Sequence, residues 1–166
     1  MRRSFLLVLW GGLLALPCSA TAHAGPALSL DQKSLETIRY YLTDGDFAEY
    51  QTWFLGKLRA HDFKTLNTYF SSMQAAYEQG VIDDVALDFA FSVFRDNRSA
   101  DDEAHYDQWV AASQGSYPAL LARGVYHFDR GWDMRGSTYA RDVPPEMWDG
   151  FYRELAVAMD DLRASL

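Results

Sequence analysis

Residues 116–136 read SYPALLARGVYHFDRGWDMRG, and this stretch decides the fold class. Its apolar residues recur every three or four positions, a spacing that is typical of an amphipathic helix. Pro118 is tolerated in the first turn of a helix that Ser116 caps. Glycines and arginines interrupt the helix-forming residues more often than ordinary packing requires. We expect a helix that starts after Ser116 and ends at Gly131, followed by a turn at Gly136.

The same spacing runs through the rest of the chain, with apolar stripes at 35–42, 47–58 and 63–77 and a last stripe at 148–162. Gly80 follows the third stripe, where a left-handed residue would close a helix, and Gly115 closes a further helix that carries Trp109 and Val110. The stripe that starts at Asp83 is apolar around most of its circumference, so we place that helix at the centre of the fold. No alternating β-branched run is present. The sequence therefore predicts an all-α protein of about seven helices.

The first 24 residues have the three parts of a secretory signal peptide. Two arginines at 2–3 precede an apolar run at 5–16, and small residues lead to Ala24. Twelve apolar residues are too few to span a bilayer. A twin-arginine signal and a lipid anchor at Cys18 are alternatives, but the short basic region and Pro17 favour general secretion. We predict a signal peptide at 1–24 and a periplasmic or secreted bacterial domain at 25–166.

Composition limits the classes of function. The chain has 15 basic and 23 acidic residues; without the two signal arginines, 13 basic residues remain and the formal charge is −10. Such a surface repels phosphate backbones and anionic membranes, so nucleic acid is not an expected partner. Cys18 is the only cysteine, so the exported domain can form no disulfide. A length of 142 residues suits one domain with one core.

Two segments echo each other 16 residues apart. Asp46 and Asp62 each precede a helix in matching contexts and are expected to cap it. The repeat is explained either by two similar helix starts or by paired helices that stack as in a solenoid. The matching positions are Leu42, Asp46, Phe47, Thr52 and Phe54 against Leu58, Asp62, Phe63, Thr68 and Phe70.

The chain also resembles a known bacterial family, described only as a domain of unknown function (number four-zero-three-four), whose members look like tetratricopeptide or Sel1-type repeats. The resemblance covers nearly all of the exported domain and is carried chiefly by Ser116-Tyr117, by residues 122–126, by Gly131-Trp132 and by Arg135-Gly136. It implies an exported array of antiparallel helix pairs and brings no assigned reaction. Family members usually continue further, so this chain is either a short member or lacks a C-terminal part.

Basic residues in the 116–136 stretch allow two interpretations. Arg123, His127 and Arg130 are four and three residues apart and would share one helical face. If Arg135 folds back beside them, the four residues would form a site for a carboxylate or phosphate. Alternatively, the arginines pair with acidic side chains of neighbouring helices and stabilise packing. Trp132 is expected in the core.

Other motifs for chemistry are missing from the sequence. No nucleophile elbow, zinc-protease helix or phosphate loop is present, so we predict no catalytic residues and no cofactor. Glu103 and His105 are two residues apart and would diverge on a helix, so no metal site is predicted. We expect a module that binds a protein or peptide in a groove between stacked helices. The alternative is a small-anion-binding or catalytic domain built on the Arg/His cluster.

Overall fold

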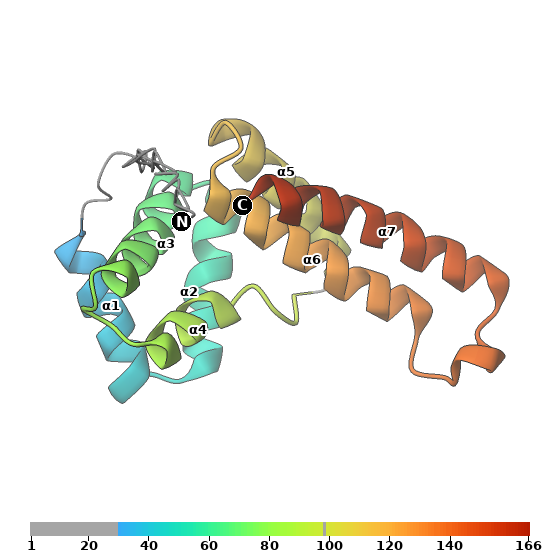
Figure 1. The fold of residues 1–166 in the computed structure, drawn as a ribbon, viewed down its shortest axis with the longest axis horizontal. Helices are drawn as coiled ribbons and strands as arrows, with labels where there is room; N and C mark the ends of the chain where they lie inside the picture. Colours follow the sequence, from blue (N-terminus) through green and yellow to red (C-terminus); the bar gives the residue numbers. More distant parts are fainter. Residues whose placement is uncertain (1–29, 98) are drawn as a thin grey trace, which may run out of the picture.

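A computed structural model describes residues 30–97 and 99–166, and within them it contains helices and no strand (Figure 1). This confirms the prediction of an all-α fold with seven α-helices. The predicted signal peptide lies outside the described residues. The helices are α1 (Gln32–Thr43), α2 (Phe47–Arg59), α3 (Phe63–Glu78), α4 (Asp84–Ser92), α5 (Glu103–Ala112), α6 (Tyr117–Arg135) and α7 (Pro145–Ala164), with two short 3-10 helices, η1 (Ala100–Asp102) and η2 (Ala140–Asp142).

Aspartates begin the first four helices. Asp31, Asp46, Asp62 and Asp83 each accept a hydrogen bond from the backbone N–H three residues later, which satisfies one of the donors that a helix start leaves free. The predicted caps at Asp46 and Asp62 are thus confirmed. Gly80 follows α3 with φ +69°, as its predicted role at a helix end requires.

The centre of the core is α3, which contacts α1, α2, α4 and α6. Its Phe70 is fully buried and packs against the rings of Phe54, Phe94 and Trp109, with centroids 6.1, 4.5 and 6.3 Å away. Hydrogen bonds between side chains also link the helices around this core. Asn67 of α3 accepts hydrogen bonds from Trp109 Nε1 at 3.0 Å and from Ser116 Oγ at 2.9 Å, which ties α3 to α5 and to the start of α6.

The prediction that the fourth helix forms the centre is wrong. Only Ala86 and Ala90 of α4 are buried, and Val85 is 67% exposed. The prediction placed all apolar residues up to Phe94 on one helix. In the structure α4 ends at Ser92, and Val93 and Phe94 enter the core from the segment that follows. Here the length of the helix, rather than its composition, decides which side chains are buried.

The longest helices, α6 and α7, form an antiparallel hairpin that extends away from the other helices (Figure 1). The predicted break at Gly131 is wrong: α6 continues through this buried glycine to Arg135 and ends at Gly136, which has φ +72°. A side chain at 131 would lie 3.4 Å from the Phe151 carbonyl of α7. This is an ordinary van der Waals distance, so α7 packs directly against Gly131 and α6 continues through a residue of poor intrinsic helix propensity.

The closest approach of the hairpin is at Gly124, and it yields a test. A methyl group there would lie 2.8 Å from Leu162 Cγ, whereas one at Gly56 of α2 would have no neighbour within 4 Å. Both Gly→Ala changes gain the same helix propensity, but only Gly124→Ala overpacks an interface. We expect Gly56→Ala to be more stable than Gly124→Ala by about 1–3 kcal/mol in urea unfolding. Equal stabilities would show that the hairpin is not this tightly packed.

Candidate binding sites

Arg123, the first residue of the predicted Arg/His cluster, joins three helices. Its Nε and Nη2 donate to the two carboxylate oxygens of Asp161 in α7, at 2.7 and 2.8 Å. Its Nη1 donates to Asp107 of α5 at 2.8 Å. Asp161 is buried, and its hydrogen bonds raise the pKa of Arg123 above the usual range. Planar guanidinium groups favour such paired contacts, and here they fasten the hairpin to α5.

His127 and Arg130 also have acidic partners. His127 Nδ1 lies 2.7 Å from a carboxylate oxygen of Glu154 in α7, and both side chains are buried. Arg130 Nη1 donates to Glu103 of α5 at 3.1 Å and to the Tyr126 hydroxyl at 2.9 Å. The three residues thus share one side of α6, but each faces a carboxylate.

Arg135 has different surroundings from these three residues. It lies in the last turn of α6, where its guanidinium carbon is 5.4 Å from the ring centroids of both Trp132 and Trp148. Its Nη1 donates to the Gly136 carbonyl. Trp132 is 43% exposed, so its predicted place in the core is wrong; its ring packs edge-to-face against Phe151 of α7, with the centroids 5.2 Å apart. The geometry favours the packing interpretation of the cluster.

A second candidate site is a pocket between α1, α2 and α3, with a volume of about 410 Å³. Its lining combines positive charge, hydroxyl groups and aromatic rings. The lysines are Lys33, Lys57 and Lys64, which are all the lysines of the chain. The other lining residues are Asp31, Ser34, Thr37, Trp53, Thr65, Thr68 and Tyr69. We refer to this cavity as the lysine pocket.

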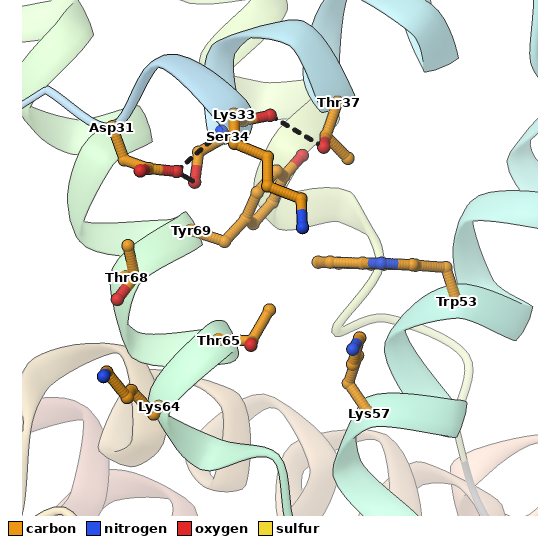
Figure 2. Close-up of a pocket in the computed structure, with 10 residues that line it drawn as sticks. All are labelled: Asp31, Lys33, Ser34, Thr37, Trp53, Lys57, Lys64, Thr65, Thr68 and Tyr69. Atoms are coloured by element: carbon orange, nitrogen blue, oxygen red, sulfur yellow. Dashed lines mark hydrogen bonds between the residues drawn. The ribbon is translucent and has the colours of Figure 1, made fainter.

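The three lysines are not equivalent (Figure 2). Lys33 from α1 and Lys57 from α2 extend toward the same space beside the Trp53 ring, whereas the Lys64 ammonium turns outward. Lys57 donates to Asp62 at 2.7 Å, and this contact lowers the pKa of the aspartate. Among the described residues, no carboxylate forms an ion pair with Lys33 or Lys64. These two ammonium groups can therefore take an anionic partner without breaking a salt bridge.

Aromatic side chains form the inner wall of the lysine pocket. Trp53 is half-buried, with its ring edge-to-face against Tyr69 at 4.9 Å and stacked on Tyr50 at 5.8 Å. The Tyr69 hydroxyl is buried and makes no hydrogen bond of acceptable geometry, although Tyr50 is near enough to influence its pKa. Tyr50 donates its own proton to the Ala90 carbonyl. Burial raises the pKa of Tyr69, so this phenol stays neutral and keeps a proton to donate.

Sequence reasoning missed the lysine pocket, although one signal was present. An acidic chain with only three lysines has them at positions 33, 57 and 64, near the starts of two predicted helices and the end of a third. Helix positions alone do not reveal that these ends meet, because this depends on how the helices cross. The Arg/His cluster was easier to notice since its members are neighbours along one helix.

Comparisons with protein-family models, with curated proteins and with solved structures found no match to the chain. The family resemblance inferred from the sequence therefore stays a prediction. In the described part of the chain, no helix is both long and apolar enough to cross a membrane.

The two interpretations of the Arg/His cluster predict different stabilities for Arg123→Ala. If the contacts with Asp161 and Asp107 hold the hairpin, the change leaves a buried carboxylate unpaired and costs about 3 kcal/mol of unfolding free energy. The matched control is Arg163→Ala, which removes an exposed pair with Asp160 at 3.7 Å and should cost less than about 0.5 kcal/mol. Urea unfolding measures both. A small loss in both variants would favour the anion-site interpretation.

Proposed function

We propose that the protein is an exported, non-catalytic binding module that holds an acidic segment of a protein or peptide in the lysine pocket. The observation that carries this proposal is the gathering of every lysine of an acidic chain around one cavity, beside a half-buried tryptophan. The periplasm or the extracellular space is the proposed location, because of the signal peptide inferred at 1–24.

Charge is the first support. The chain as a whole is negative, so an acidic ligand is repelled from most of the surface and attracted at the pocket. Lys33 and Lys64 have no carboxylate to displace among the described residues. A carboxylate from outside would form charge-assisted hydrogen bonds with Lys33 in the cavity and with Lys64, once its exposed side chain swings inward from the rim. Local charge of this kind directs both the encounter and the register of a partner.

Shape and chemistry are the second support. A volume of about 410 Å³ lies within the range of ligand pockets and accommodates a few side chains rather than a folded domain. Trp53 offers an apolar surface for the methylene groups of glutamate or for a neighbouring apolar residue. Thr65 points into the cavity and offers a hydroxyl group near the lysines (Figure 2), whereas the Tyr69 hydroxyl is fully buried in the wall.

The alternative function is binding or conversion of a small anion at Arg123, His127, Arg130 and Arg135. Its support is the chemistry of these residues and their place on α6. Its cost is that an incoming anion would have to displace Asp161, Asp107 or Glu103 from existing ion pairs. The lysine pocket demands no such exchange at Lys33 or Lys64, so we favour it.

Peptide selection tests the proposed function without assuming a partner. Octapeptides selected from a random displayed library on the purified protein should be enriched in Asp and Glu. Their affinity, measured by isothermal titration calorimetry, should fall at least tenfold in Lys33→Ala/Lys64→Ala, because about 1.4 kcal/mol per contact corresponds to a factor of ten. Rising salt should weaken the wild-type complex.

The matched control is Arg39→Ala/Arg153→Ala, which removes the same two charges from exposed positions that do not line the lysine pocket. It should keep the wild-type affinity within about twofold, since screened distant charges contribute little. Selection of peptides without acidic residues, or equal losses in both double variants, would contradict the proposal. Phosphate or sulfate that stabilises the wild type but not Arg123→Ala would instead support the Arg/His site.

A further inference from the structure

Two histidines far apart in the sequence meet at the surface between α2 and α5. His61 lies in the turn after α2, and His105 lies in the first half of α5. His61 Nε2 and His105 Nδ1 are 3.0 Å apart, so one ring nitrogen donates to the other. In the sequence, the neighbouring candidate metal ligand of His105 is Glu103, and the two side chains point away from each other on a helix. The sequence therefore does not predict the contact between His105 and His61.

The backbone at His61 has an uncommon conformation that fixes the position of its ring. Its φ is +56°, and the N–H groups of His61 and Asp62 donate to the Leu58 and Lys57 carbonyls. This is the Schellman ending of a helix, where glycine is the usual residue because it lacks a Cβ. The corresponding position after α3 is Gly80, with φ +69°. A histidine here holds an imidazole at a place where glycine would be accommodated more easily.

We propose that His61 and His105 form a surface site for a divalent transition-metal ion of the Zn²⁺, Ni²⁺ or Cu²⁺ class. Imidazole nitrogens bind such ions at about 2.0–2.1 Å, so two ligands at right angles lie about 2.9 Å apart and two at the tetrahedral angle about 3.4 Å apart. The observed 3.0 Å falls between these values. When the shared proton is lost, small rotations of the two rings direct one nitrogen lone pair of each ring at the same ion.

With only two protein ligands, the proposed site leaves coordination positions open on the metal ion. In the described residues, no three His, Cys, Asp or Glu side chains converge as a metal centre, so the remaining coordination positions belong to water or to a ligand from outside. Neutral imidazoles select Cu²⁺, Ni²⁺ and Zn²⁺ over Ca²⁺ and Mg²⁺, which prefer oxygen ligands. Affinity among the three should follow Cu²⁺ > Ni²⁺ and Cu²⁺ > Zn²⁺.

A partly buried ion pair and an aromatic ring lie next to the histidines. Asp102 is buried next to this site, and Arg59 binds both of its oxygens, at 2.7 and 2.8 Å. That pairing holds the pKa of Asp102 below its usual value, so the residue stays ionised and its charge acts on His105. Phe63 stacks against His61 at 5.4 Å and supports one face of the ring. Asp102 thus lies near the site but is paired with Arg59, so we do not count it among the metal ligands.

Metal titration of the protein without a histidine tag tests this site. Calorimetry with ZnCl₂ or NiCl₂ at pH 7.5 should show one ion per chain, and CaCl₂ and MgCl₂ should give no heat. In ¹⁵N spectra of the imidazoles, the His61 and His105 nitrogens should shift together on zinc addition. The buried His127, paired with Glu154, serves as the internal control and should not shift.

His61→Gly separates metal binding from folding, because glycine adopts the left-handed conformation at this position readily. The variant should melt at or above the wild-type temperature without metal and lose at least tenfold in zinc affinity. His105→Gln should lose a similar factor. The proposal fails if either single variant binds zinc as the wild type does, or if zinc shifts only one of the two histidines. A calcium response would show instead that oxygen ligands elsewhere on the acidic surface bind the ion.

Discussion

Burial of Phe70 is the constraint on which the rest of the fold depends. The ring lies among aromatic side chains from α2, α5 and the segment after α4, so its burial fixes the rotation of α3 about its axis. A helix that turns one face to the core must turn the opposite face elsewhere. Thr65 and Thr68 therefore face the cavity between α1 and α2, and the lysine pocket follows from how the core is packed.

Charge is distributed differently in the two halves of the molecule. In the hairpin half, Arg123 and Arg130 are paired with carboxylates of neighbouring helices, and the ion pairs hold α5, α6 and α7 together. In the other half, two lysines at the cavity have no such partner among the described residues. Cations with partners stabilise packing, whereas cations without partners remain free to meet a ligand. This contrast, more than residue type, separates the two candidate sites.

The sequence predicted what depends on neighbours along the chain. Apolar periodicity identified the helices, and Asp46, Asp62 and Gly80 were placed correctly at helix ends, because caps are local. Predictions that depend on contacts between helices were less accurate. Gly131 resembles a helix break by propensity alone, yet α6 continues through it where α7 packs alongside. The lysine pocket and the histidine pair bring together residues from different helices, and no spacing rule encodes such meetings.

The restriction of lysine to one cavity has a chemical consequence. Apart from the α-amino group, these 166 residues carry primary amines only at Lys33, Lys57 and Lys64. Reagents that couple amines to carboxylates without a spacer would therefore join a captured acidic molecule at the rim of this cavity and at no other side chain. A missed tryptic cleavage at one of the three lysines, together with the added mass, would then identify the coupled position. The position of the three lysines therefore allows site-specific crosslinking of an acidic ligand bound in the cavity.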